Sequence, residues 1–370
     1  MSEWKEYILE DVIERFIDYR GKTPKKTDVG IPMVTAKIVK AGRILEPNEF
    51  IAEEDYDAWM TRGLPEIDDV VLTTEAPLGE VALIKDKKIA LAQRIITLRG
   101  NKAYLHNPFL KYYLQSATGQ YELQSRASGT TVFGIKAAIL KKMTVSLPSL
   151  PEQKAIASVL SSLDDKIDLL HRQNKTLEAM AETLFRQWFV EEAQEDWEEG
   201  HLGDVIELHY GKGLKTEERA GSGYPVVGSS GIVDYHTEFL VKGPGIVIGR
   251  KGTLGKVIYL WVNFYPIDTT YYVKSKVESA GLLYEYFLLK TIGFEDMNTD
   301  SAVPGLNRDI ALSTEIKIPP ENKLHDFNEL VADFVGKLKT NRDQIHSLES
   351  LRDTLLPKLM SGEVCVDYAH

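Results

Sequence analysis

Two stretches of the chain carry apolar residues at alternating spacings of four and three positions. The first runs from Ile156 to Trp188 and the second from Phe327 to Leu359. This spacing, kept over four to five heptads, is typical of helices that pair in a coiled coil. Prolines precede both stretches, as they often do where a helix begins. The pattern predicts long helices over residues 151–190 and 319–362, although two amphipathic helices packed on their own domains would show the same spacing.

Each helical stretch has one asparagine at a core position, Asn174 in the first and Asn341 in the second. Such a residue either points to solvent or fixes the register of the pair. If the helices are antiparallel, facing core residues have numbers that sum to 515, which sets Asn174 against Asn341 and Ile156 against Leu359. A parallel pairing would leave both asparagines unmatched. Because a buried unsatisfied amide costs about 1–3 kcal/mol, we expect the antiparallel register.

The sequence outside these helices contains an internal repeat. The matching segments are, in order, 4–14 with 197–207, 30–34 with 223–227, 70–72 with 246–248, and 145–148 with 316–319. The offset falls from 193 to 171 along the series, as insertions and deletions in loops would produce. An ordered series of matches indicates an internal duplication.

Both copies read as mixed α/β. Short β-branched runs predict strands at Val70–Thr73, Ile95–Leu98 and Gly245–Ile248, with glycine-containing turns between them. Apolar residues at helical spacing predict helices at Phe109–Leu123 and Leu282–Ile292.

The fold expected from these elements is α+β. Two globular α/β domains, related by a pseudo-twofold axis, are separated by two long helices that form an antiparallel coiled coil. The predicted boundaries are residues 1–150 for the first domain, 151–190 for the first helix, 191–318 for the second domain, 319–362 for the second helix and 363–370 for a tail.

Composition narrows the class of protein. The 370 residues suit two domains, and 43% apolar with 27% charged residues is ordinary for a globular protein. We see no signal peptide and no apolar run near the roughly 20 residues that a membrane span needs. One cysteine, Cys365, excludes an internal disulfide and a paired-cysteine metal site. We expect a cytoplasmic protein that does not bind membranes.

The net charge of −11 argues at first against DNA binding, because phosphate contacts favour basic surfaces. Its distribution changes this view. Residues 1–150 carry 21 basic and 20 acidic side chains, and residues 201–318 carry 12 and 14. Most of the excess acid lies in residues 151–200 and 319–370. Each near-neutral block can therefore present a basic face.

Motifs for chemistry are incomplete. Asn107-Pro108-Phe109 resembles the loop of adenine methyltransferases but lacks the second proline and a preceding glycine-rich cofactor loop. The segment 249–257 resembles a phosphate loop, but its spacing is one residue too long and it lacks the Ser or Thr that would hold Mg²⁺. The eight histidines show no metal-ligand spacing. We expect no catalytic residue, no metal and no cofactor, and therefore no enzymatic activity of the chain itself.

Basic, glycine-rich loops recur at corresponding places in both copies. Glycine lets backbone amides approach phosphates, lysine neutralises charge, and Arg or Gln side chains can read guanine or adenine. The candidate DNA contacts are Lys22, Lys25, Lys26, Gln93 and Arg94 in the first copy, and Lys212, Lys215, Arg250, Lys251 and Thr253 in the second. Any one of them could equally lie in a solvated turn.

The helical segments carry a family resemblance. Residues 147–167, from Leu-Pro-Ser-Leu-Pro-Glu-Gln-Lys to Asp-Asp-Lys-Ile, resemble the first shared helical region of type I restriction–modification specificity subunits. Residues 355–362, Leu-Leu-Pro-Lys-Leu-Met-Ser-Gly, resemble the end of the second. The layout of the whole chain is similar to that family. One departure is Pro320-Glu321-Asn322, which stands where the first copy has Pro151-Glu152-Gln153.

The resemblance implies that each globular domain is a target-recognition domain that reads one half of a bipartite site in double-stranded DNA. It also implies that the helices hold the domains apart and dock two methyltransferase (modification) subunits, which would bind S-adenosylmethionine and flip the target adenine. Restriction subunits would join the same assembly. Further DNA-contact candidates follow, because two polar loops look like the family's DNA-approaching loop: Thr130 and Thr131 in the first copy, Asn307 and Arg308 in the second.

We interpret the chain as a non-catalytic, sequence-specific DNA-binding subunit. One alternative is an enzyme, either a fused restriction–methylation protein or a solitary nuclease; the missing catalytic motifs count against it. The other is a coiled-coil adaptor that binds only protein. DNA affinity that falls steeply with salt would distinguish DNA recognition from the adaptor.

Overall fold

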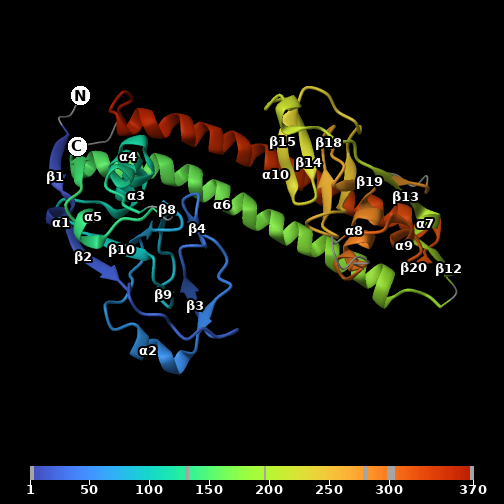
Figure 1. The fold of residues 1–370 in the computed structure, drawn as a ribbon, viewed down its shortest axis with the longest axis horizontal. Coiled ribbons are helices and arrows are strands. Elements are labelled where there is room, and N and C mark those ends of the chain that lie inside the picture. Colours follow the sequence, from blue (N-terminus) through green and yellow to red (C-terminus); the bar gives the residue numbers. More distant parts are fainter. Residues whose placement is uncertain (1–3, 130–132, 196, 278–281, 298–304, 367–370) are drawn as a thin grey trace. The chain divides into compact units, whose positions relative to one another are not determined.

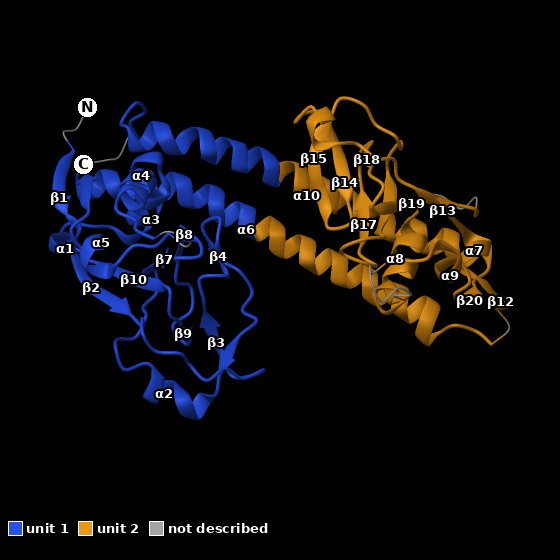
Figure 2. Cartoon of the chain, in the orientation of Figure 1, with its two compact units in different colours: residues 1–168, 345–370 blue, residues 169–344 orange. Residues whose placement is uncertain are grey.

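The computed structural model describes residues 4–129, 133–195, 197–277, 282–297 and 305–366. The chain falls into two compact units. Unit 1 comprises residues 1–168 and 345–370, and unit 2 comprises residues 169–344 (Figure 2). Both units contain an antiparallel sheet, a smaller sheet and parts of two long helices, so the predicted α+β class is confirmed.

Unit 1 is built on a four-stranded antiparallel sheet with the order β2-β10-β7-β8. A smaller sheet has the order β6-β3-β9, in which β3 pairs in parallel with β9. The strands are β1 (Lys5–Ile8), β2 (Ile13–Asp18), β3 (Ile31–Val34), β4 (Val39–Lys40), β5 (Arg43–Ile44), β6 (Phe50–Ile51), β7 (Val70–Thr74), β8 (Leu78–Leu83), β9 (Ala90–Leu91), β10 (Ile95–Gly100) and β11 (Thr144–Leu147). The helices of the globular part are α1 (Leu9–Val12), α2 (Tyr56–Trp59), α3 (Asn107–Gln115), α4 (Ala117–Ser125) and α5 (Ala137–Leu140).

Unit 2 repeats this topology. Its four-stranded antiparallel sheet has the order β13-β19-β16-β17, and its smaller sheet has the order β15-β14-β18 with a parallel β14–β18 pair. The strands are β12 (Glu198–His201), β13 (Ile206–Tyr210), β14 (Tyr224–Gly228), β15 (Gly231–His236), β16 (Gly245–Gly249), β17 (Val257–Leu260), β18 (Tyr265–Pro266), β19 (Thr270–Ser275) and β20 (Glu315–Ile318). The helices are α7 (Leu202–Val205), α8 (Leu283–Thr291) and α9 (Arg308–Leu312). The duplication expected from the sequence is therefore a duplication of the strand order.

The three strands expected from β-branched runs are present as β7, β10 and β16, all fully buried. The single helix expected at Phe109–Leu123 is wrong in one respect, because the chain forms two helices there. Ser116 between them is extended, and its Oγ accepts a hydrogen bond from Gly119 N, which caps α4. Side-chain capping ended the helix at a point that apolar spacing alone did not mark.

The long helices are α6 (Leu150–Arg186) and α10 (Glu321–Met360), and each contributes to both units. In unit 1, Ile156 of α6 and Leu359 of α10 belong to the same buried cluster as the four-stranded sheet (Figure 1). In unit 2, the rings of Trp188 and Phe327, a pair that sums to 515, lie 6.2 Å apart. Within each unit the helices are therefore antiparallel, as predicted.

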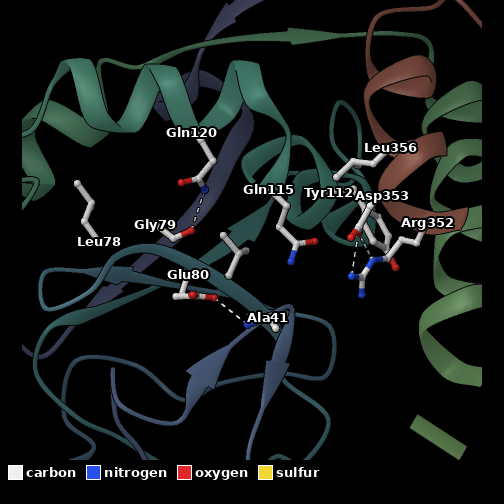
Figure 3. A pocket seen from close by; sticks show the side chains of 11 residues that line it. Ala41, Leu78, Gly79, Glu80, Tyr112, Gln115, Gln120, Arg352, Asp353 and Leu356 are labelled. Carbon is white, nitrogen blue, oxygen red and sulfur yellow. Dashed lines mark hydrogen bonds and ion pairs between the residues drawn. The ribbon is translucent and has the colours of Figure 1, made fainter. Parts of the chain in front are cut away.

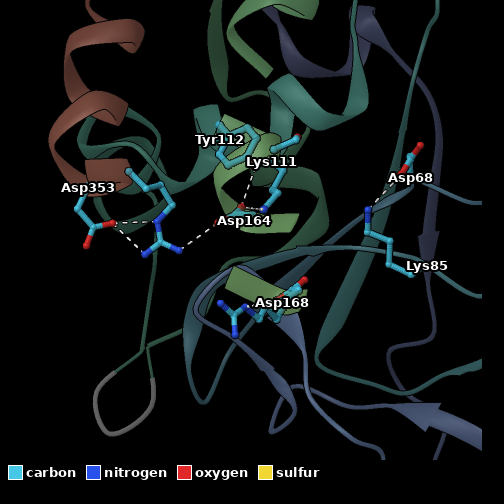
Figure 4. A network of polar contacts seen from close by, with 10 residues as sticks. Asp68, Lys85, Lys111, Tyr112, Asp164, Asp168 and Asp353 are labelled. Atoms are coloured by element: carbon cyan, nitrogen blue, oxygen red, sulfur yellow. Dashed lines mark hydrogen bonds and ion pairs between the residues drawn. The ribbon is translucent and has the colours of Figure 1, made fainter. Parts of the chain in front are cut away.

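The helix pair is fixed to the globular part of unit 1 by a buried polar network (Figure 4). Lys111 on α3 is only 4% exposed and donates from Nζ to Asp164 Oδ2 on α6 at 2.5 Å. The Tyr112 hydroxyl donates to the same oxygen at 2.7 Å. Arg352 Nη1 on α10 donates to Asp164 Oδ1 at 3.1 Å. One carboxylate thus joins α3, α6 and α10.

In unit 2 the corresponding helix α8 places an acid in the core instead. Glu285 is 2% exposed, and Ser275 Oγ donates to its Oε1 at 2.5 Å. Burial raises the pKa of Glu285, because the charged form loses its hydration there. The contact between α8 and the long helices is aromatic: the ring of Phe185 on α6 lies against those of Phe287 on α8 and Phe327 on α10. The two units therefore attach to the helices by different chemistry.

The two core asparagines meet, as the antiparallel register requires. Asn341 is fully buried, and its Nδ2 donates to Asn174 Oδ1 at 2.9 Å and to Gln173 Oε1 at 3.4 Å. Asn341 Oδ1 finds no hydrogen-bond partner among the described residues. The pair is thus held mainly by one amide-to-amide hydrogen bond.

Replacing Asn174 alone by leucine should destabilise the protein by about 1–3 kcal/mol, because the amide of Asn341 then stays buried without its main partner. Replacing both asparagines by leucine should cost less than the single change, since no buried amide remains. Denaturant unfolding of the full chain measures both. A single variant as stable as the unchanged protein would contradict this account of the register.

Candidate nucleic-acid interface

Most of the candidate residues of the second copy lie at one end of the strands in the four-stranded sheet of unit 2. We call this end of the strands the edge of the sheet. β13 ends there at Tyr210, β16 ends at Gly249, and β19 begins at Thr270. The segment before α9 joins this edge, because Lys251 forms a β-bridge with Gly305 and Leu306 N donates to Arg250 O at 3.0 Å. Antiparallel strands that end together bring their loops to one surface.

Arg250 is the most firmly held basic side chain at this edge. Its guanidinium carbon lies 5.0 Å from the ring centroid of Tyr210 and 5.6 Å from that of Tyr271. Its Nη1 donates to the backbone oxygen of Asp268 at 2.9 Å. The backbone is fixed as well, because Arg250 N donates to Thr269 O at 2.9 Å. Arginine over an aromatic ring is stabilised by cation–π attraction, which preserves its planar orientation.

A second arginine lies against Tyr210. The guanidinium carbon of Arg308 is 5.6 Å from the Tyr210 ring centroid, while its side chain stays 43% exposed and Nε lies 3.4 Å from Asp309 Oδ1. Asn307 has a structural task, since its Oδ1 accepts from Asp309 N and Ile310 N and caps α9. The structure therefore brings Arg308 to this edge and gives Asn307 a capping contact.

Glycines shape the loops around these arginines. A Cβ on Gly249 would collide with the backbone oxygen of Thr253, so the loop between β16 and β17 folds back closely on itself. Lys251 and Thr253 in that loop are exposed. A Cβ on Gly211 would similarly collide with the backbone oxygen of Ile267. These close approaches require glycine at both positions.

Lys212 and Lys215 follow β13. Lys212 is exposed, and its backbone N donates to Pro266 O at 3.0 Å, which keeps the start of this loop beside β18. Lys215 is also exposed and precedes the short 3-10 helix Thr216–Glu218. Only Lys212 adjoins the strand ends that hold Arg250.

The same edge of the sheet in unit 1 has an ion pair in place of the arginine–tyrosine cluster. Arg94 Nε lies 3.1 Å from Glu75 Oε1, and both side chains are partly exposed. Thr74 N donates to Arg94 O at 2.9 Å, the counterpart of the contact between Arg250 N and Thr269 O. Arg94 has φ +69°, a left-handed conformation that costs a non-glycine residue about 1–2 kcal/mol. Gln93 beside it is half-buried.

The other candidates of unit 1 lie in the loop after β2. Lys22 and Lys25 are exposed, whereas Lys26 Nζ forms an ion pair with Glu49 Oε2 at 2.6 Å beside β6. Thr130 and Thr131 lie outside the described residues. Among the described residues, Gly134 forms a β-bridge with Glu75 as Gly305 does with Lys251.

Some residues at these edges carried no signal in the sequence. Tyr210 and Tyr271 come together because β13 and β19 pair in a register that sets them opposite each other. Burial raises the pKa of Tyr271, whose hydroxyl donates to Leu306 O at 3.0 Å. In unit 1, Arg20 Nη2 donates to Ile135 O at 3.0 Å. A tyrosine directly before Gly211-Lys212 was the one available hint, since aromatic rings often accompany basic loops in nucleic-acid sites.

The rival chemical motifs have structural roles. Asn107 begins α3, and its Oδ1 accepts from Gly100 N at 2.7 Å. In the described part of the chain, no group of three or more His, Cys, Asp or Glu side chains is arranged to hold a metal ion. None of the described helices has the length and apolar character that a membrane span requires.

A cavity of about 280 Å³ in unit 1 lies between β8, α4 and α10 (Figure 3). Its polar groups already bind each other. Gln120 Nε2 donates to Gly79 O at 2.8 Å, and Glu80 Oε2 accepts from Ala41 N at 2.8 Å. Arg352 is engaged with Asp353 at 2.9 Å and with Asp164. This arrangement leaves no convergent set of free polar groups for a small substrate.

Sequence comparison matches both copies of the repeat to one family model. A family model described as the type I restriction modification DNA specificity domain matches residues 1–179 and again 194–349. The chain is 28% identical over 344 residues to the type I restriction enzyme MjaIX specificity subunit of Methanocaldococcus jannaschii, which covers 80% of this chain and 78% of that protein. It is also 28% identical over 275 residues to the putative type I specificity subunit S.MgeORF438P of Mycoplasma genitalium, covering 68% and 70%.

A crystal structure of a type I restriction–modification S subunit from M. genitalium shares the fold. It matches with a TM-score of 0.64 at 20% identity, over 97% of this chain and 96% of that chain. Both copies of the repeat thus match one and the same domain model.

Proposed function

Because this chain belongs to the specificity subunits of type I restriction–modification systems, we propose that it recognises a bipartite DNA target without catalysing a reaction. Each unit reads one half of the target with the loops at one edge of its four-stranded sheet. The long helices carry the methyltransferase subunits, and restriction subunits join the same complex.

The observation that supports this proposal most is the repeated placement of basic loops. In each unit an arginine lies beside one of the strand ends at this edge, although the two positions are not equivalent: Arg94 directly precedes β10 in unit 1, and Arg250 directly follows β16 in unit 2. Arginine at a fixed position suits base reading, and the exposed lysines nearby suit phosphate contacts. A protein that bound only protein would need neither.

The helix pair offers a surface for a protein partner. On α6 of unit 2, Ala179, Met180 and Leu184 line a shallow groove, and Met180 is 46% exposed. Met-rich and apolar strips on exposed helices are common at protein interfaces. We propose that a methyltransferase subunit docks along this part of the helix pair.

The experiment that tests the proposal is to map N6-methyladenine in cells with and without the gene for this chain. Loss of one split motif, with other methylated motifs unchanged, is the expected result. No change in any motif would overturn the proposal, and cleaved or methylated DNA from the pure chain would favour an enzyme.

Purified alone, the chain should bind DNA weakly and without methyl transfer. The two recognition blocks are near neutral and the whole chain has a net charge of −11, so the chain alone can form few contacts with phosphates. Adding the methyltransferase subunits should bring specific binding with a steeper dependence on salt, because the partners add phosphate contacts. Titrations of a labelled duplex at two or more salt concentrations measure this. Equal affinity with and without the partners would contradict it.

A further inference from the structure

Arg250 differs from the other basic side chains of unit 2 because every part of it is held in place. Its backbone N donates to Thr269 O, its backbone O accepts from Leu306 N, and its Nη1 donates to Asp268 O. The ring centroids of two adjacent tyrosines lie 5.0 Å and 5.6 Å from the guanidinium carbon. Arg250 is therefore half-buried and oriented before any ligand arrives.

A guanidinium held in this way is suited to a planar acceptor pair. It carries five N–H donors in a fixed fork, so the contact with Asp268 leaves donors for a further ligand. The O6 and N7 atoms of guanine form such a planar pair in the major groove. A phosphate can accept from the same fork, but it carries no sequence information and can be bound by a flexible point charge as well. The adjacent Lys251, exposed on the same loop, is a flexible point charge of the kind that suits a phosphate.

Unit 1 has no arginine at this position. The counterpart of Arg250, judged by the matching backbone contacts, is Thr74, and the counterpart of Lys251 is Glu75, which pairs with Arg94. The two sheet edges therefore present different donors and acceptors to DNA. The base preference supplied by Arg250 belongs to one half of the target alone.

We infer that Arg250 is the side chain with which unit 2 reads a guanine. Tyr210 is a positioning residue, because its ring holds the guanidinium of Arg250 in place. This inference rests on the proposed DNA-reading function and assigns one base contact within it. The contact is bidentate, from the guanidinium to O6 and N7 of the base.

The test uses the complex of this chain with its methyltransferase subunits and duplexes that carry the motif methylated in cells. Each guanine of the half read by unit 2 is replaced in turn by 7-deazaguanine, which lacks the N7 acceptor. At one guanine, the replacement should weaken binding by the unchanged complex about tenfold, the value of one good contact to a base. In the Arg250→Ala complex the same replacement should have almost no effect.

Two further variants separate base reading from charge and from folding. Arg250→Lys keeps the charge but loses the fork, so it should restore the salt dependence of binding without restoring the guanine preference. Lys251→Ala is the matched control on the same loop, and it should weaken binding to all sequences alike and reduce the salt slope by about 1. Tyr210→Phe should retain the preference, whereas Tyr210→Ala should weaken it.

The outcomes are distinct. If every 7-deazaguanine costs the Arg250→Ala complex as much as the unchanged complex, Arg250 does not read guanine, and the proposed function stands. A preference retained in full by Arg250→Lys would also overturn the inference, because charge alone would then suffice. If the unchanged complex shows no sequence preference at all, the proposed function itself fails.

Discussion

Exchanging residues 201–318 for the same block of another specificity subunit should change one half of the methylated motif completely and leave the other half as it was. The sheet edge with Tyr210 and Arg250 lies wholly inside the exchanged block, and the edge with Arg94 lies outside it. Mapping N6-methyladenine in cells that carry the chimera measures the result.

The chimera keeps α6 and α10 of this protein, so the helices that we propose bind the methyltransferase subunits, and with them the spacing between the half-sites, should not change. A matched control exchanges residues 1–150 instead and should alter the opposite half. A chimera in which both halves of the motif change would show that the units do not read DNA independently.

Replacing Asp164 by alanine should destabilise the folded chain by about 3–5 kcal/mol at neutral pH. The change leaves Lys111, 4% exposed, and the half-buried Arg352 without the carboxylate that both contact. Removing one partner of a buried ion pair costs this much, because the remaining charge stays in a poorly hydrated site. Denaturant unfolding of the full chain measures the loss.

The matched control replaces Lys111, Asp164 and Arg352 together by leucine or methionine of similar volume. It should cost much less than Asp164→Ala, since no uncompensated charge remains. A triple variant less stable than the single one would contradict this account. The network would then contribute more by its hydrogen bonds than by avoiding an unpaired charge.

The same network predicts that the free energy of unfolding depends on pH. Burial by itself would raise the pKa of Asp164, but the positive charge of Lys111, with hydrogen bonds from Lys111, Tyr112 and Arg352, holds that pKa below its ordinary value. A group whose pKa is lowered on folding contributes stability above its unfolded pKa, about 3.9 for aspartate, and loses it as the pH falls through the folded pKa. The difference between the unchanged protein and Asp164→Ala should therefore narrow below about pH 4.

The parts of the fold that the sequence predicted are those set by local periodicity and by repetition. The heptad spacing predicted both long helices and the pairing of Asn174 with Asn341, which the structure shows. The break at Ser116 was missed because a side-chain cap leaves no trace in apolar spacing. Asp164 and Arg352 were also missed as partners. They lie 188 residues apart, and Arg352 occupies a core position of the heptad spacing, where an apolar residue is usual.

The candidate interface shows a similar division. Glycine and lysine in short loops predicted candidates that the structure brings to one edge of the sheet in unit 2. The position of Arg250 beside the paired rings of Tyr210 and Tyr271 depends on the register of β13 against β19, which a single sequence does not specify. The N-cap contact of Asn307 at the start of α9 was likewise not predicted, and its role as a DNA contact stays a prediction.

The chemistry that joins α3, α6 and α10 also bears on how such a gene can evolve. By the repeat offset of 171, the position of α6 that corresponds to Arg352 is Ala181, and the position of α10 that corresponds to Asp164 is Val335. A tandem duplication of the first half would therefore leave Asp164 facing alanine, with Lys111 as the one remaining cation of the network. Recombination between the two long helices leaves all three charged residues in place. Shuffling the segment between the helices therefore keeps this network intact, whereas an exact duplication of the first half would lose one of its three charged members.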